Sequence, residues 1–243
     1  MEKNIERIER KYIFISGTIG AGKSTIVEKI KERFANASIS VIKEYIDYDP
    51  EGDKMLNEYL SGKMTCFDFQ VYMLQQYEKQ INGAEGKVLL FERHPLEGLL
   101  FASVKLSEDE LHKLYNVMMQ FIVAAKIPAP WKCSVKEYDG EDNYLLEKIC
   151  HDIQYGTKTI CHIAVSEQEQ VLRLLRRNRQ SDIDYLSEQG MKYLRHINEL
   201  YRATVVIKYH LTPHYWTIFY RNRYDPIPIV MNVERHDENN SEY

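Results

Sequence analysis

The chain has 243 residues, of which 44% are hydrophobic and 28% are charged, and its formal net charge is −4. These proportions are typical of a globular domain and exclude a disordered or fibrous chain. The acidic balance argues against nucleic acid as a partner, because proteins that bind phosphate backbones usually carry a basic excess. The charged N-terminus and the absence of a long apolar run predict an intracellular protein with no membrane partner.

Short apolar runs alternate along the chain with helical patterns, which is typical of a parallel sheet with helices on both faces. The apolar runs predict five buried strands, at Tyr12–Ile15, Ile39–Ile42, Val88–Phe91, Thr159–Val165 and Ile227–Val233. Helical spacing predicts helices at Gly22–Ala35, Thr65–Asn82, Ser107–Lys126, Glu167–Arg177 and Asp184–Lys208. Thr65, Ser107 and Ser166 are the expected N-caps. We therefore expect a single α/β domain over residues 1–243, built on a five-stranded parallel sheet.

Residues 127–158 interrupt this alternation. Pro128 and Pro130 stand near the start of the stretch, and the cluster Asp139-Gly140-Glu141-Asp142 follows. Prolines and Asp/Gly clusters are typical of turns and loops. The sequence therefore predicts an insertion or a long loop here.

Residues 17–24 read Gly-Thr-Ile-Gly-Ala-Gly-Lys-Ser, which fits the P-loop pattern at every fixed position. A predicted strand precedes this segment and a predicted helix follows it, so that backbone N–H groups can point at bound phosphates. Lys23 would contact the β and γ phosphates, and Ser24 would offer its hydroxyl to Mg²⁺. The expected nucleotide-binding residues of the loop, 17–25, are Gly17, Thr18, Ile19, Gly20, Ala21, Gly22, Lys23, Ser24 and Thr25.

Two further predicted strands end in charged residues. Glu44 follows the second strand, and Glu92-Arg93 ends the third. Ligands of open parallel sheets bind beyond the carboxyl ends of the strands, which makes these residues candidates for a shared site. Glu92 would complete the Mg²⁺ shell through water, and Arg93 would span donor and acceptor oxygens.

A basic cluster occupies the end of the fourth predicted helix. It consists of Arg173, Arg176, Arg177 and Arg179 and precedes Asp182. One interpretation is a solvated basic helix face. The alternative is a lid that delivers arginines to the transition state of phosphoryl transfer.

Together these residues resemble the deoxynucleoside kinases, the family of the cellular deoxycytidine and deoxyguanosine kinases and the herpesvirus-type thymidine kinases. Residues 17–25 look like the family's P-loop, and Glu92-Arg93-His94-Pro95 is similar to the Asp-Arg-His-Pro stretch of the viral enzymes. The resemblance implies a P-loop kinase fold with a basic lid, and phosphorylation of a deoxynucleoside 5′-hydroxyl by ATP and Mg²⁺ in nucleotide salvage. It also implies a homodimer and a cytoplasmic location, which for a viral protein is the host cytoplasm.

The resemblance further implies a role for each candidate residue. Glu44 would be the general base, and the other catalytic residues would be Lys23, Arg93, Arg177 and Arg179. The lid would span residues 173–182, with Arg173 and Arg177 also on the donor nucleotide. The acceptor would be bound by Glu44, Tyr59, Gln70, Met73, Arg93 and Asp182, where Asp182 replaces the family's usual glutamate. The loop after the last predicted strand, residues 234–237, would hold the adenine.

The acceptor preference follows from three positions. Enzymes that accept deoxycytidine or purines tend to carry an Arg and an Asp where this chain has Tyr77 and Gly98, and Met73 matches a methionine of the viral thymidine kinases. These residues favour thymidine. A thymidylate-type nucleoside monophosphate kinase is the alternative, although Glu44 would repel an acceptor phosphate. A GTPase switch would require an Asn-Lys-x-Asp motif, which the sequence lacks.

Overall fold

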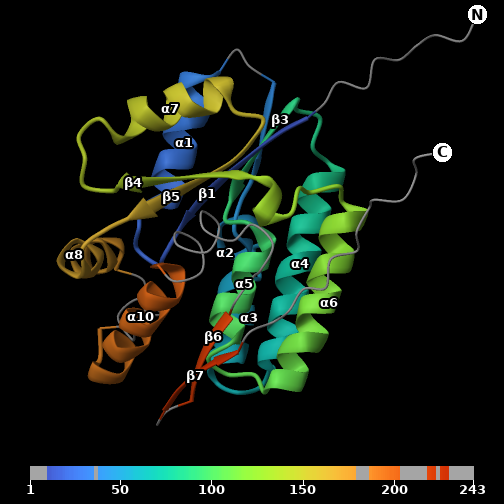
Figure 1. The fold of residues 1–243 in the computed structure, drawn as a ribbon, viewed down its shortest axis with the longest axis vertical. Coiled ribbons are helices and arrows are strands. Elements are labelled where there is room, and N and C mark those ends of the chain that lie inside the picture. Colours follow the sequence, from blue (N-terminus) through green and yellow to red (C-terminus); the bar gives the residue numbers. More distant parts are fainter. Residues whose placement is uncertain (1–9, 36–37, 179–185, 203–217, 223–224, 230–243) are drawn as a thin grey trace, which may run out of the picture.

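The computed structural model describes residues 10–35, 38–178 and 186–202, and the backbone of residues 218–222 and 225–229. Its centre is a five-stranded sheet in which every neighbouring pair of strands is parallel (Figure 1). In spatial order the strands are β2 (Ile39–Ile42), β3 (Val88–Glu92), β1 (Lys11–Gly17), β5 (Lys158–Ala164) and β4 (Ser134–Asp139). This architecture confirms the predicted α/β class and its parallel sheet.

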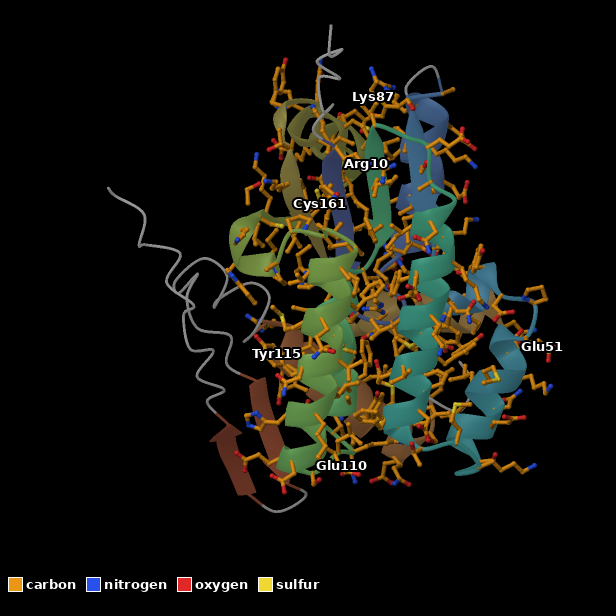
Figure 2. The ribbon with its side chains drawn as sticks, turned by 90° about the vertical axis from the view of Figure 1, so that its right-hand side faces the viewer. Arg10, Glu51, Lys87, Glu110, Tyr115 and Cys161 are labelled. Atoms are coloured by element: carbon orange, nitrogen blue, oxygen red, sulfur yellow. The ribbon has the colours of Figure 1, made fainter. Side chains whose placement is uncertain are left out.

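Helices cover both faces of the sheet (Figure 1). One face carries α1 (Lys23–Arg33) and α7 (Leu145–Tyr155). The opposite face carries α4 (Cys66–Asn82), α5 (Gly98–Ala102), α6 (Glu108–Ala124) and α10 (Glu188–Tyr201). The remaining helices are α2 (Tyr45–Tyr48), α3 (Gly52–Leu60) and α8 (Glu167–Arg177), with short 3₁₀ helices η1 (Pro95–Glu97) and η2 (Pro130–Lys132). Helices α4 and α6 pack against each other and lie side by side in Figure 2, where Tyr115 marks α6.

Alternation of side chains along β1 produces the two layers. Tyr12 and Phe14 belong to the core with α4, α5 and α6, whereas Ile13 and Ile15 belong to the core with α1 and α7. Successive residues of a strand point to opposite faces, so a strand buried on both sides must be apolar throughout. The apolar run that predicted β1 is therefore the direct consequence of its central place in the sheet.

The predicted N-caps are confirmed. The Thr65 hydroxyl accepts a hydrogen bond from the Asp68 amide at 3.0 Å and caps α4. Ser107 and Glu110 form the reciprocal capping box at the start of α6, and Ser166 caps α8. Each cap satisfies backbone donors that have no partner within the helix.

The prediction of an insertion or long loop at residues 127–158 is wrong. Strand β4 pairs with β5 in parallel register, from Ser134 opposite Thr159 to Asp139 opposite Ala164. Helix α7 buries Leu145, Ile149 and Ile153 against α1 and the sheet. These elements therefore supply the fifth strand and half of one helical layer.

The prediction of a fifth parallel strand at Ile227–Val233 is also wrong. Residues 227–229 belong to β7 (Asp225–Ile229), which pairs antiparallel with β6 (Ile218–Asn222) in a separate two-stranded sheet. Pro226 and Pro228 lie within β7, and proline cannot donate the hydrogen bonds of an inner strand. Residues 230–233 and the expected adenine loop at 234–237 lie outside the described residues.

The topology brings three strand ends together. β1 lies between β3 and β5, and β3 lies beside β2, so the P-loop after β1, Glu44 after β2 and Arg93 after β3 share one edge of the sheet. Among the described residues, none of the helices is both long and apolar enough to cross a membrane.

If α7 is part of the core, Ile149→Ala should lower the free energy of unfolding by about 2 to 5 kcal/mol, because Ile149 is fully buried. Denaturant unfolding of the purified protein measures this change. Tyr155→Ala on the same helix is the control, since Tyr155 is 72% exposed and should change stability by about 0.5 kcal/mol or less. Equally small effects of both substitutions would mean that α7 contributes little to the core.

Candidate active site

The P-loop connects β1 to α1 through a backbone that requires glycine. Gly20 and Gly22 have φ angles of 78° and 89°, in the left-handed region that other residues enter only at a cost. A Cβ atom on Gly22 would also stand 2.9 Å from Nη1 of Arg173. The loop leads directly into the N-terminus of α1, where unpaired N–H groups and the helix dipole favour a bound phosphate.

A cavity of about 1180 Å³ opens in front of the P-loop. It is lined by the P-loop with the first part of α1, the residues after β2, Leu56 of α3, the end of β3, the loop after β4 with the start of α7, and one face of α8. Of the residues predicted from the sequence, it is lined by Ile19, Gly20, Ala21, Gly22, Lys23, Ser24, Thr25, Glu44, Glu92, Arg93, Arg173 and Arg177. The structure therefore brings the phosphate-binding loop and both candidate carboxylates to one space. Gly17 and Thr18 lie at the start of the loop, outside this lining.

Lys23 is a buried cation at the first position of α1. Its ammonium donates a hydrogen bond to the Thr18 carbonyl at 3.1 Å, across the P-loop. Burial and, to a smaller extent, nearby Arg93 lower the pKa of Lys23 to about 8, while the carboxylates of Glu44, Glu92 and Glu97 act in the opposite direction. Near neutral pH most of this lysine is charged and available to phosphate oxygens.

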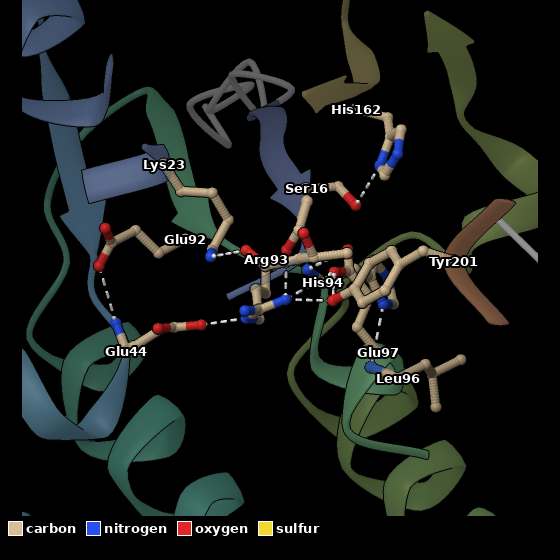
Figure 3. A network of polar contacts seen from close by, with 12 residues as sticks. Ser16, Lys23, Glu44, Glu92, Arg93, His94, Leu96, Glu97, His162 and Tyr201 are labelled. Atoms are coloured by element: carbon tan, nitrogen blue, oxygen red, sulfur yellow. Dashed lines mark hydrogen bonds and ion pairs between the residues drawn. The ribbon is translucent and has the colours of Figure 1, made fainter. Parts of the chain in front are cut away.

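Arg93 is the centre of the polar network in Figure 3. Its φ of 68° lies in the left-handed region, which is strained for a residue with a side chain. The guanidinium forms an ion pair with Glu44, and Nη1 donates to the Gly17 carbonyl and to the Tyr201 hydroxyl. The Arg93 amide also donates to the Ile15 carbonyl at 3.1 Å. This side chain therefore links β1, β3, the end of β2 and α10.

The surroundings of Glu44 and Glu92 shift their pKa values in opposite directions. Burial alone would raise the pKa of Glu44, but Arg93 and Lys23 lower it to about 2, so Glu44 is ionised at neutral pH. Burial and the charge of Glu44 raise the pKa of Glu92 above its ordinary value. The Glu44 amide donates to Oε2 of Glu92 at 3.1 Å, which holds the two residues adjacent.

Ser24 and Glu92 fit the expected Mg²⁺ site. The Ser24 side chain is hydrogen-bonded to Glu92, so the two predicted oxygen donors are neighbours. The other carboxylate oxygen of Glu92, Oε1, is buried without a hydrogen-bond partner in the described structure. Mg²⁺ usually binds through one or two protein oxygens together with waters and substrate phosphates. A buried carboxylate oxygen without a hydrogen-bond partner is suited to bind a cation.

The arginines of the predicted lid have different surroundings. Arg173 donates to Glu169 at 2.7 Å, to the Ala21 carbonyl at 2.7 Å and to the Gly140 carbonyl at 2.8 Å. It therefore supports the backbone of the P-loop and ties it to the loop after β4. Arg177, at the end of α8, is exposed on the cavity and lowers the pKa of Glu44. Arg179 and Asp182 lie outside the described residues.

The predicted acceptor residues Tyr59, Gln70 and Met73 do not line the cavity formed by the described residues. Tyr59 on α3 stacks flat on Phe69, with 4.5 Å between ring centres, and its hydroxyl donates to the Cys66 sulfur at 3.8 Å. Met73, on α4, is half-buried. These contacts place Tyr59 beside α4.

Gln70 is the most informative of the acceptor residues. It is 2% exposed on α4, and its Oε1 has no hydrogen-bond partner among the described residues. A Cβ atom on Gly98 would stand 2.4 Å from this oxygen, so the amide can occupy its position only because residue 98 lacks a side chain. Tyr77, the other position predicted to set the acceptor, is buried and donates to the Glu92 carbonyl at 3.0 Å.

Comparison with known proteins assigns the chain to a family. The family profile for deoxynucleoside kinase matches residues 13–136, slightly more than half of the 243 residues. The chain belongs to the deoxynucleoside kinase family. It is therefore a kinase, and the family implies ATP as the phosphate donor. The match contains the P-loop, Glu44, Gln70 and the Glu92-Arg93 pair.

Thymidylate kinases are also similar to this deoxynucleoside kinase. The enzyme of Helicobacter pylori (strain ATCC 700392 / 26695) is 29% identical over 161 residues, 61% of this chain and 80% of that protein. That of Helicobacter acinonychis (strain Sheeba) is 30% identical over 175 residues, 65% and 84% of the two chains. Among solved structures, deoxyadenosine kinase from M. mycoides with bound dATP has a TM-score of 0.50 at 22% identity, covering 80% of this chain and 83% of that one. This structure supports the fold.

Sequence reasoning missed three residues of this kinase's site. Glu97 and Tyr201 contact Arg93, and Gln170 on α8 donates to the P-loop carbonyl of Ile19 at 2.5 Å. Glu97 stands five positions after Glu92, in a stretch that is buried throughout, and a carboxylate in such a stretch is a usable signal of an internal partner. Tyr201 and Gln170 carry no local signal, because their contacts depend on how α8 and α10 pack.

The pKa of Lys23 predicts how nucleotide binding depends on pH. If charged Lys23 binds phosphate, the dissociation constant for Mg·ATP should be nearly constant below pH 7 and rise by up to about tenfold per pH unit above pH 8, as Lys23 loses its proton. Isothermal titration calorimetry between pH 6.5 and 9.5 measures it. Lys23→Arg, which stays charged over this range, should remove the dependence. A constant affinity of the wild-type protein up to pH 9.5 would contradict this role of Lys23.

Proposed function

We propose that this kinase transfers the γ-phosphoryl group of ATP, with Mg²⁺, to the 5′-hydroxyl of a deoxyribonucleoside, and that thymidine is the preferred acceptor. The observation that carries the proposal is the ionised carboxylate of Glu44 in the same cavity as the P-loop, paired with Arg93. A carboxylate at this point suits a neutral hydroxyl, which it can orient by accepting its hydrogen bond.

The chemistry follows from the charges around the cavity. Phosphoryl transfer depends mainly on positioning and on neutralising the negative charge that spreads over the transferred group. Lys23, the N–H groups at the start of α1 and exposed Arg177 supply positive charge from the donor side. Glu44 would hold the acceptor hydroxyl and take its proton late in the reaction, as a carboxylate with a pKa of about 2 is a weak base. Mg²⁺, held by Ser24 and Glu92, would supply further neutralisation of the phosphates.

The acceptor preference rests on Gln70. Its buried, unpartnered Oε1 is an acceptor that gains most from an N–H donor, and a pyrimidine base such as thymine offers one. Tyr77 and Gly98 leave no charged pair next to this amide, and Gly98 leaves the space that the amide fills. We propose that Tyr59, Met73 and Asp182 also contact the acceptor and that Arg179 is an arginine of the lid. The proposed enzyme is a cytoplasmic homodimer that acts in nucleotide salvage.

A thymidylate kinase is the second candidate, and the observation that favours it is the similarity to the Helicobacter thymidylate kinases. A monophosphate acceptor would bring two more negative charges toward Glu44. Arg93, the cation nearest to Glu44, already contacts Glu44, the Gly17 carbonyl and the Tyr201 hydroxyl. The electrostatics therefore favour a nucleoside.

An acceptor panel separates the candidates. With Mg·ATP, the release of ADP above a blank without acceptor should be fastest with thymidine, and kcat/KM for deoxycytidine, deoxyadenosine and deoxyguanosine should be lower by about tenfold or more. Turnover with thymidylate alone would establish the second candidate. A preference for a purine would overturn the interpretation of Gln70, Tyr77 and Gly98.

Glu44→Gln tests the catalytic carboxylate. The amide keeps the shape of the side chain but cannot take the proton, so kcat should fall by about 10² to 10⁴ while the affinity for Mg·ATP changes little. Steady-state kinetics and calorimetry give the two values. Glu78→Gln, an exposed carboxylate on α4, is the matched control and should retain wild-type turnover. Full turnover of Glu44→Gln would remove Glu44 from this role.

A further inference from the structure

A second layer of buried polar groups lies behind Arg93, on the side away from Glu44 (Figure 3). Glu97 in η1 is 1% exposed and Tyr201, the last residue of α10, is fully buried. Buried carboxylates and hydroxyls are costly unless they are hydrogen-bonded. Glu97 and Tyr201 contact each other, and both contact Arg93.

The contacts form a directed chain. Nη1 of Arg93 donates to the Tyr201 hydroxyl, and this hydroxyl donates to Oε2 of Glu97 at 2.8 Å. Oε2 also lies 3.7 Å from Nη1 of Arg93, while Oε1 of Glu97 accepts from the His94 amide at 3.0 Å. The Tyr201 hydroxyl can serve both neighbours only in this orientation, as acceptor from the arginine and donor to the carboxylate.

The rings around the guanidinium limit its rotation. Its central carbon is 4.9 Å from the ring centre of Phe101 and 5.7 Å from that of Tyr201. The Tyr201 ring in turn stacks on His162, with 5.7 Å between ring centres. Together with Glu44 and the Gly17 carbonyl, these groups fix both the plane and the position of the guanidinium.

Helix α10 contacts the phosphate side of the site by a second route. The side-chain amide of Asn198 donates a hydrogen bond to Oε1 of Gln170 at 3.0 Å. The side-chain amide of Gln170 in turn donates to the Ile19 carbonyl in the P-loop at 2.5 Å. One turn of α10 thus touches both the P-loop, through Gln170, and Arg93, through Tyr201. The placement of this helix and the geometry of the site depend on each other.

We propose that Tyr201 and Glu97 are positioning residues that hold the Arg93 guanidinium in the orientation needed for phosphoryl transfer. The inference rests on the proposed function for the role of Arg93, while Tyr201 and Glu97 act only through it. Loss of the Tyr201 hydroxyl leaves Arg93 with fewer partners and freedom to shift, which affects the reacting groups more than the binding of ATP.

Tyr201→Phe removes the hydroxyl and keeps the ring that packs on Phe101 and His162. We expect kcat to fall by about ten- to a hundredfold, as for loss of a hydrogen bond to a charged group, with the KM for ATP within about twofold of the wild-type value. The acceptor is the one that the wild-type enzyme uses in the panel. A different acceptor would thus revise the proposed function and leave this test intact.

Two controls separate positioning from a structural effect. Tyr115→Phe on α6 also removes a buried tyrosine hydroxyl, but this hydroxyl has no partner in the described structure, so kcat should be unchanged. Both variants should remain folded at the assay temperature and bind ATP with the wild-type stoichiometry. A Tyr201→Phe protein that loses ATP-binding sites in proportion to kcat would be partly unfolded, and its loss of activity would contradict positioning.

A double-mutant cycle with Arg93→Lys decides whether Tyr201 acts through Arg93. In the Arg93→Lys background, Tyr201→Phe should lower kcat by less than about twofold, because the contact is already lost. The same four proteins give a cycle in denaturant unfolding, which needs no acceptor and therefore remains decisive even if no acceptor is turned over. An equal loss of kcat in both backgrounds, or the absence of coupling in unfolding, would overturn the proposal.

Glu97→Gln is a second, independent variant. The amide oxygen can still accept one hydrogen bond, but the charge beside Arg93 is gone. We expect kcat to fall with the KM for ATP nearly unchanged, and the effects of Glu97→Gln and Tyr201→Phe to be less than additive. Wild-type kcat in Glu97→Gln would remove the carboxylate from the positioning pair.

Discussion

The rest of the site depends on the burial of the Arg93 guanidinium among its hydrogen-bond and ion-pair partners. Its removal from water costs several kcal/mol unless charged and polar partners surround it. Those partners come from separate elements: Glu44 after β2, the Gly17 carbonyl at the end of β1, and Tyr201 on α10. The backbone of Arg93 takes a left-handed conformation, with φ of 68°, directly after β3. A strained backbone persists only where its surroundings determine it, and here the same surroundings fix the position of the Glu44 carboxylate.

The buried charge of Arg93 also explains why the two neighbouring carboxylates, Glu44 and Glu92, have different pKa values. Glu44 lies against Arg93, so its pKa is low and it is charged when an acceptor hydroxyl arrives. Glu92 is buried beside the charge of Glu44, so its pKa is raised, and its Oε1 has no hydrogen-bond partner in the described structure. Lys23 is close enough to both carboxylates for their charges to raise its pKa. Arg93 and Lys23 thus give two neighbouring carboxylates opposite pKa shifts, and the proposed roles of Glu44 and Glu92 rest on this difference.

The sequence was sufficient for those parts of the site that depend on local pattern. The P-loop, Glu44 and Glu92-Arg93 each follow an apolar run, because central parallel strands are buried on both faces. Strand β4 was missed for the opposite reason: it is an edge strand in which only Val135 and Tyr138 are buried, so it has no apolar run. The apolar run at 227–233 was misleading because Pro226 and Pro228 flank its first residue, and prolines are excluded from an inner strand. Tyr201 could not be predicted, since it meets Arg93 from 108 positions away through the packing of α10.

The most direct test of the account is the position of the acceptor relative to Glu44. A crystal structure with ADP, Mg²⁺ and thymidine would show it. The account predicts the 5′-hydroxyl oxygen within about 2.6 to 3.2 Å of the Glu44 carboxylate, with Arg93 still paired to Glu44 and the Gln70 amide on the base. A 5′-hydroxyl far from Glu44, with the base away from Gln70, would contradict it.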